Sequence, residues 1–229
     1  LTPSSPDQRF TLAPEAYELD GPGSATWTTL ASAVGAALAG TGTSLGAASS
    51  VSPRMVWIMP HIYTGIGPAE GEKEALALYD GVSLIGASSN ARTTVLENYA
   101  FTMPSGGRVV LRGIHFRRCS FASAMTDQGE IVFEDCQFED CTVSFVDTAA
   151  LGPTYGFVRC GGRFDSFEVA PVSPCAVEVH FVGSNGAAPL QFAQSITAKG
   201  TGQVSFLLNN GHEIEVVTPH APFAFELRQ

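Results

Sequence analysis

Two stretches of this chain match each other without a gap at an offset of 22 residues. Residues 107–119 read GRVVLRGIHFRRC, and residues 129–141 read GEIVFEDCQFEDC. Glycine, valine, phenylalanine and cysteine recur at the same positions, and the apolar positions between them agree in character. A repeat of about 20 to 30 residues in a strand-rich sequence is typical of a solenoid, in which each repeat forms one coil. We therefore expect the two stretches to be stacked neighbours.

The charges of the two stretches are complementary. Four arginines lie opposite four acids: Arg108 and Glu130, Arg112 and Glu134, Arg117 and Glu139, and Arg118 and Asp140. Opposite charges across paired strands help to fix their register. The same alignment predicts two further ladders inside the coils, with Phe116 above Phe138 and Cys119 above Cys141.

A third copy follows at an offset of 26 residues. It places Val158 in a ladder with Val110 and Val132, and it adds Phe164 to the phenylalanine ladder. Further short apolar segments predict the other strands, at residues 56–60, 81–86, 93–96, 176–182, 203–208, 214–217 and 223–227. Short strands with inward apolar residues at every second position, repeated once per coil, predict an all-β chain folded as a parallel β-helix of about six or seven coils.

The first quarter of the chain has a different character. Residues 1–23 contain four prolines and predict an extended arm, and residues 24–53 predict a capping helix and a loop, before a β-helix domain at 54–229. Within residues 25–40 an apolar face recurs at helical spacing, with Ser24 as the expected cap and Gly40 as the end. Its members are Trp27, Leu30, Ala31, Val34 and Leu38. Because the first coil exposes unpaired backbone groups, we expect this helix to cover it.

The entry into the coils carries a more specific pattern. The helix is followed by VWIMPHIY at residues 56–63, LYDGVSLIG at 78–86 and TVL at 94–96. This order resembles the pectin lyase-like superfamily over roughly residues 25–217, although Pro60-His-Ile-Tyr63 replaces the Pro-Gly turn that is usual there. The resemblance implies a right-handed, single-stranded β-helix. Since the superfamily includes polysaccharide lyases, glycoside hydrolases and virion proteins, the fold leaves the function open.

The densest acids, at 134, 135, 139 and 140, have two interpretations. They could form a catalytic or calcium-binding patch, or they could be neutralised by the arginines of the neighbouring coil. We favour neutralisation, in which only Asp135, opposite Gly113, lacks a partner. The remaining candidates for a catalytic group are scattered over different coils: Asp127, Asp147, Asp165 and Arg163.

Metal and cofactor sites are not expected from the pattern. The five histidines, at 61, 115, 180, 212 and 220, show no metal-ligand spacing. The five cysteines contain no C-x-x-C motif and are expected to be reduced and buried, with Cys119 and Cys141 as the one candidate bridge. Among the aromatic residues, Trp57 is expected in the core, and Tyr99 and Tyr155 are the candidates for contact with a glycan or a protein.

The charge and the hydropathy exclude some partners. A net charge of −10 with only 12 Lys and Arg argues against phosphate-mediated binding of nucleic acid. No apolar run approaches the roughly 18 to 20 residues of a membrane span. We expect a non-enzymatic structural or adhesion protein of a virion, such as a phage spike, decoration or tail component. Its expected partners are other virion proteins, two further copies of itself in a homotrimer and a cell-surface glycan.

Two alternatives remain open. One is a secreted lyase or hydrolase that acts on acidic glycans with Asp127, Asp147, Asp165 and Arg163. The other is a glycan-binding module without chemistry.

Overall fold

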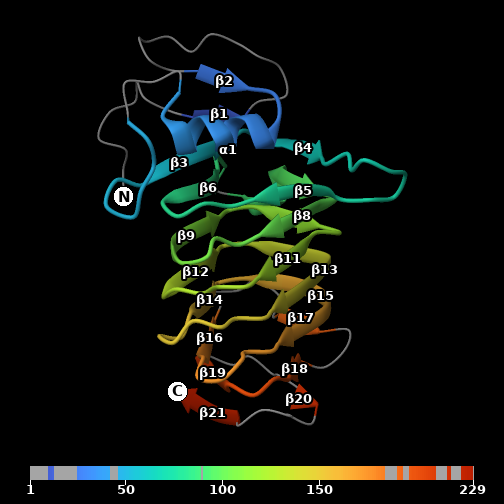
Figure 1. Cartoon of the computed structure of the whole chain (residues 1–229). Helices are drawn as coiled ribbons and strands as arrows, with labels where there is room; N and C mark the ends of the chain where they lie inside the picture. Colours follow the sequence, from blue (N-terminus) through green and yellow to red (C-terminus); the bar gives the residue numbers. More distant parts are fainter. Residues whose placement is uncertain are drawn as a thin grey trace.

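The computed structural model describes residues 10–12, 25–41, 46–88, 90–183, 190–192, 196–209, 216–217 and 223–228. Within these residues the chain is a parallel β-solenoid of about six turns with one short helix at its N-terminal end (Figure 1). The expected coil architecture is therefore confirmed.

One side of the solenoid is a ten-stranded parallel sheet, which we call the first sheet. From the N-terminal end its strands are β2 (Ala25–Trp27), β1 (Phe10–Leu12), β3 (Arg54–Ile58), β6 (Val82–Gly86), β9 (Gly107–Arg112), β12 (Gly129–Glu134), β14 (Thr154–Val158), β16 (Ala176–Val182), β19 (Gln203–Asn209) and β21 (Phe223–Arg228). From β3 onward each coil contributes one strand, so every neighbour in the sheet is one turn of the chain away.

The second sheet has eleven strands and covers the remaining sides in two rows. One row consists of β4 (His61–Thr64), β7 (Thr94–Glu97), β10 (His115–Arg117), β13 (Gln137–Phe145), β15 (Gly161–Val169), β18 (Ile196–Ala198) and β20 (Val216–Val217). The other row begins with β5 (Glu74–Ala77), β8 (Tyr99–Thr102) and β11 (Ser120–Ser123), and it joins the first row where β11 pairs with β13. β17 (Leu190–Phe192) pairs with β15. The long strands β13 and β15 serve both rows in the middle coils.

The register of the first two copies is the predicted one. β9 pairs with β12 from Gly107 opposite Gly129 onward, and β10 pairs with β13 with Phe116 opposite Phe138. The predicted register of the third copy is wrong by two residues, because Gly156, and not Val158, lies opposite Val132. The coil is therefore longer than its predecessor by two residues, and not by four.

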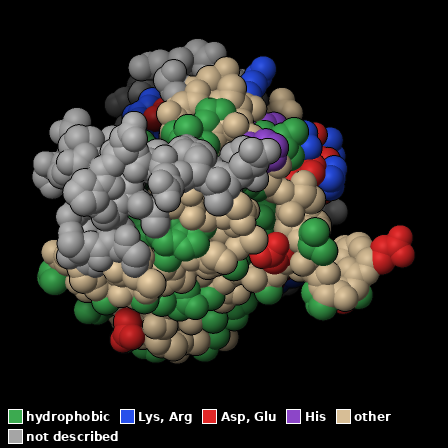
Figure 2. All heavy atoms as spheres, turned by 90° about the horizontal axis from the view of Figure 1, so that it is seen from above, with side chains coloured by type: hydrophobic (Ala, Val, Ile, Leu, Met, Phe, Trp, Pro, Cys, Tyr) green, Lys and Arg blue, Asp and Glu red, His purple; other side chains and the backbone are tan. Residues whose placement is uncertain are grey.

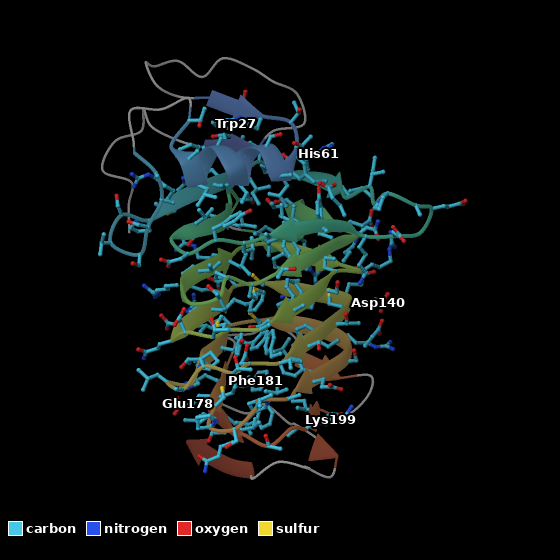
Figure 3. All side chains as sticks on the ribbon, viewed as in Figure 1. Trp27, His61, Asp140, Glu178, Phe181 and Lys199 are labelled. Atoms are coloured by element: carbon cyan, nitrogen blue, oxygen red, sulfur yellow. The ribbon has the colours of Figure 1, made fainter. Side chains whose placement is uncertain are left out.

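The phenylalanine ladder survives this shift. Phe116 and Phe138 stack with centroids 5.7 Å apart, and Phe138 and Phe164 follow at 4.5 Å. The backbone opposite Phe138 is Gly162, at a φ of 100°, and a Cβ there would lie 2.0 Å from the carbonyl oxygen of Phe138. No side chain fits at this position, so the ring that stacks on Phe138 comes from Phe164, two residues further on. The same core continues to Phe181, which points into the stack (Figure 3).

The corners of the coils use left-handed backbone conformations. Gly113, Asp135 and Arg159 form one column where the chain leaves the first sheet, with φ values of 67°, 53° and 50°. Asn98, Arg118 and Asp140 form a second column between the two rows of the second sheet. Each non-glycine corner costs on the order of 1 kcal/mol, so the stacking of the adjoining strands must hold it.

A cysteine follows four of these corners: Cys119, Cys136, Cys141 and Cys160. Each thiol points inward and donates to a carbonyl oxygen of the preceding coil at 3.2 to 3.4 Å. All described cysteines are reduced and buried, so the expected state is confirmed and the candidate bridge between Cys119 and Cys141 is not formed. Burial raises the pKa of the Cys141 and Cys160 thiols, which keeps both protonated.

The helix α1 (Leu30–Ala39) is shorter than predicted. It begins after Thr29, whose side chain accepts a hydrogen bond from the Ser32 N–H, and it ends at Gly40 with a left-handed φ of 70°. The end at Gly40 is confirmed. Trp27 is instead in β2, and the expected cap at Ser24 is wrong because Thr29 caps the helix, five residues later.

The helix covers the end of the first sheet together with two additional strands. β1 lies between β2 and β3 in parallel register, so the predicted extended arm contributes a strand to the sheet. Phe10 is 1% exposed and stacks on Trp27 with centroids 5.6 Å apart. Leu30, Ala33 and Ala37 of α1 join the same core.

Candidate functional site

The predicted charge ladder has the expected backbone register but mostly different ion pairs. Arg108 and Glu130 pair as predicted, at 2.7 Å. The other three predicted pairs do not form: Arg112 with Glu134, Arg117 with Glu139, and Arg118 with Asp140. Successive rungs lie roughly 4.8 Å apart, so a long arginine side chain can reach the coil on either side. The more buried carboxylate then attracts it, since an unpaired charge is costlier away from water.

Glu97, at the end of β7, attracts two arginines. Its side chain is 9% exposed and contacts Arg117 at 2.5 Å and Arg118 at 2.8 Å, and Thr64 donates a third hydrogen bond at 3.1 Å. Burial alone would raise the pKa of Glu97, but the hydrogen bonds from Arg117 and Thr64 and the two nearby positive charges outweigh it and lower the pKa. Glu97 therefore stays ionised at neutral pH.

The acidic cluster is only partly neutralised, and by a residue that the sequence comparison missed. Arg159, from the following coil, contacts Glu134 at 2.5 Å and Asp135 at 2.7 Å. Asp135, expected to lack a partner, is thus paired, and these hydrogen bonds raise the pKa of Arg159. Glu139 contacts His115 at 3.3 Å. Asp140 forms no ion pair with another described residue and projects from the outer side of the stack (Figure 3).

Asp147 is a buried structural group and not a surface carboxylate. It is 0% exposed and accepts hydrogen bonds from the Ser123 hydroxyl, the Met125 N–H and the Tyr155 hydroxyl at 2.7 to 2.8 Å. Burial and the charge of Asp147 raise the pKa of Tyr155, which keeps its hydroxyl a donor. This network ties three successive segments of the stack together beneath the surface.

The other proposed catalytic candidates lie elsewhere. Asp127 is exposed in the turn before β12, whereas Arg163 and Asp165 lie on β15 and contact each other loosely at 3.8 Å. The structure therefore brings Arg163 and Asp165 together and leaves Asp127 and Asp147 apart from them. A sequence pattern could not separate these cases, because all three aspartates follow or interrupt short apolar strands.

Two adjoining pockets flank β4 at the N-terminal end of the second sheet. The first, of about 530 Å³, is lined by Pro60, His61, Ile62, Arg92, Thr93, Val95, His115 and Arg117. The second, of about 500 Å³, is lined by Thr28, Thr29, His61, Ile62, Tyr63, Thr64, Ile66, Glu74 and Tyr99. Because both share His61 and Ile62, they form one depression along β4. Basic and histidine side chains gather on this side of the end face (Figure 2).

The first pocket combines arginine and histidine side chains from three elements. Arg92 lies on the short helix η1 (Ala91–Thr93), His115 and Arg117 on β10, and His61 on β4. Burial lowers the pKa of His115, as do the charges of Arg117 and Arg92, while Glu139 raises it less strongly. His115 is therefore neutral at pH 7. No sequence spacing links these residues, since they come from three separate segments between 61 and 117.

The aromatic residues are distributed differently from the prediction. Tyr99 and Tyr155 are 4% and 0% exposed, because both follow the inward alternation of their strands, although Tyr99 also lines the floor of the second pocket. Trp57 is half-buried on the outer side of β3, between the core residues Val56 and Ile58. Tyr79, at 39%, is the most exposed tyrosine that the structure describes.

Two further properties concern the described residues only. No three His, Cys, Asp or Glu side chains among them are placed to hold a metal ion. In the same residues, no helix has the length and apolar character needed to cross a bilayer.

Against known proteins, the chain matches no protein-family model, no curated protein and no solved structure. What its own geometry establishes is a parallel β-solenoid of about six turns, with paired charges along its outer faces and one basic depression at its N-terminal end.

Proposed function

We propose that this chain is a non-enzymatic structural or adhesion module of a virion, such as a spike, decoration or tail component, built on a pectin lyase-like β-helix and assembled as a homotrimer. The observation that carries the proposal is the use of its carboxylates. Glu97, Glu134 and Asp135 are held by arginines, and Asp147 is held inside the core. Groups engaged in this way stabilise the stack and are poorly placed to act on a substrate.

The build of the solenoid supports the same role. Its core is a continuous column of rings that runs from Phe101 through Phe133 to Phe206. Such a column gives a stiff body whose outer faces can contact neighbours along their length. The first sheet is extended at its end by β1 and β2, which lengthens that body.

The proposal is tested by locating the protein. Immunogold labelling with antibodies to the chain should decorate particles released by the organism that encodes it. Sedimentation equilibrium of the purified protein should give about three times the chain mass of 24.0 kDa. A monomer that labels no particle would contradict both parts of the proposal.

The enzyme alternative is tested in parallel. An acidic-glycan lyase or hydrolase would cleave polygalacturonate, with or without calcium, and would lose activity in Asp165→Asn or Arg163→Gln. We expect no cleavage by the unaltered protein. Turnover that depends on either residue would replace the structural proposal with the enzymatic one.

A further inference from the structure

The second sheet ends in two strands with an open edge. Among the described strands, β4 pairs only with β7, and β5 pairs only with β8. The Gly65 N–H donates to the Glu97 carbonyl oxygen at 2.8 Å. Because alternate residues of a strand direct both backbone groups to the same neighbour, Ile62 and Thr64 direct theirs away from β7. Backbone groups like these, which pair with no other described strand, are a template for a further strand.

The depression beside this edge would hold the side chains of such a strand. Ile62 is 48% exposed and lies between the two pockets, each of about 500 Å³. A strand that pairs with β4 would run past both of them. The second pocket adds Ile66, which is 84% exposed, so apolar surface lies close to the open backbone groups.

The first pocket carries an excess of positive charge. Arg117 and Arg118 share the single carboxylate of Glu97, and Arg92 forms no ion pair with any residue in the described part of the chain. Glu139, which contacts His115, is the second carboxylate beside the pocket, so three arginines face two carboxylates. This excess is local, because the chain as a whole has a net charge of −10. A guanidinium group binds a carboxylate through two parallel hydrogen bonds, so the pocket is complementary to an acidic side chain.

We propose that the edge of β4 is the docking site for an extended acidic peptide of an assembly partner, which adds as a strand and places a carboxylate beside Arg92 and His61. This inference rests on the proposed function and names the partner class for it. Main-chain pairing supplies the affinity in this mode of recognition, and the side-chain pocket supplies the specificity.

The test uses three labelled peptides and fluorescence anisotropy. The first is a capped heptapeptide of alternating valine and threonine with a central aspartate, the second has asparagine at that position, and the third is the aspartate peptide with N-methyl groups on alternate residues. We expect the aspartate peptide to bind about tenfold more tightly than the asparagine peptide, as one charge-assisted contact allows. The methylated peptide should bind at least tenfold more weakly than the aspartate peptide, because it cannot form all of the backbone hydrogen bonds to β4.

Variants of the protein locate the site. Arg92→Gln, at an exposed residue, should remove the preference for aspartate while binding of the asparagine peptide stays the same. Ile62→Pro removes an outward N–H and should weaken both unmethylated peptides. Ala77→Pro is the matched control, since Ala77 has the same position on the open edge of β5, away from the basic pocket. Should Ile62→Pro fail to fold, the methylated peptide tests the same hydrogen bonds in the unaltered protein.

Several outcomes would overturn the proposal. These are equal affinity for the aspartate and methylated peptides, an aspartate preference that survives Arg92→Gln, or binding of tri-galacturonate and of no peptide. Particle labelling separates this failure from that of the proposed function. Labelled particles together with inert peptides would remove the docking site and leave the assembly role in place.

Discussion

The two sheets of the solenoid end in opposite ways at the N-terminal side. The first sheet continues past the first complete coil through β1 and β2, and α1 packs against them. The second sheet stops at β4 and β5, with no further described strand beyond them. An open stack end exposes apolar core and unpaired backbone groups together. Here only the apolar core is covered, and the open backbone groups lie on the side with the basic depression.

Covering the end of a solenoid therefore involves two separate requirements. Burial of Phe10 and Leu30 over the core removes apolar surface from water, which is a stability requirement. Pairing of the edge prevents unwanted strand addition, which is a specificity requirement. A chain that meets the first and leaves the second open retains a place where a partner strand can join.

The largest expected effect comes from the covered side. Phe10→Ala removes a ring that is 1% exposed and stacked on Trp27, so it should lower the free energy of unfolding by about 3 to 5 kcal/mol. Ile62→Ala, on the open side, should change it by no more than about 0.5 kcal/mol. Urea unfolding followed by circular dichroism measures both. Similar losses in the two variants would mean that the ends are equally covered.

The next largest effect on stability comes from the ion pairs, which differ between the two sheets. Glu97→Gln leaves Arg117 and Arg118 without their shared carboxylate and should cost about 1.5 to 3 kcal/mol. Glu130→Gln breaks the exposed pair with Arg108 on the first sheet and should cost about 0 to 1 kcal/mol. The urea midpoints of the two variants give the comparison. A larger loss of stability in Glu130→Gln would show that burial does not determine how much these ion pairs contribute to the free energy of unfolding.

A smaller effect concerns the corner that holds the segment between β4 and β5. This segment projects from the side of the stack (Figures 1 and 2), and Asn98 donates from Nδ2 to the carbonyl oxygens of Gly65 and Glu72 at 2.8 and 3.0 Å. Asn98→Gly keeps the left-handed corner but loses both bonds, and it should cost about 1 to 2 kcal/mol. Trypsin should also cleave faster at Lys73.

The matched control is the equivalent corner two coils further along the same column. Asp140→Gly lies at a φ of 51° and removes a side chain that makes no ion pair with the described residues, so stability should change by less than about 0.5 kcal/mol. Unchanged cleavage at Lys73 in Asn98→Gly would show that the strands, and not Asn98, hold the projecting segment.

The sequence predicted the stack well because stacking repeats residue types. The 22-residue offset gave the correct register for β9 and β12, since both copies present the same inward pattern. The third copy failed because Gly162 breaks the pattern, and a side-chain ladder through Phe164 conceals a backbone shift of two residues. An alignment based on residue type therefore identifies which rings stack on each other, and it does not identify which backbone positions pair.

The candidate site could not be predicted in the same way. Arg159 neutralises two acids from a coil that the repeat comparison aligned incorrectly, and the direction in which Arg117 reaches depends on the burial of Glu97. Neither feature can be read from the spacing of residues in the sequence. The basic depression also depends on where β4 ends the sheet, which is a property of topology and not of any motif.

The smallest effect is the pH dependence of the open side. The pKa of His115 is lowered in the folded protein by burial, assisted by Arg117 and Arg92 and opposed by Glu139. In the unfolded chain it is near its ordinary value of about 6.5. Below that value the unfolded state binds the proton more readily, so the contribution of His115 to stability is complete above pH 6.5 and is lost as the pH falls through the folded pKa.

The contribution of Glu97 to stability is also lost as the pH falls, but at a lower pH than that of His115. Its pKa is lowered from 4.5, so its contribution is present above that value and is lost only under more acidic conditions. Between pH 7 and 5.5 the loss on the open side should therefore come from His115, and His115→Gln should flatten the dependence of the melting temperature on pH in this window. His180→Gln, at a half-buried histidine of the first sheet paired with Glu178, is the control. An identical slope in His115→Gln and the unaltered protein would show that the acid sensitivity arises away from the open side.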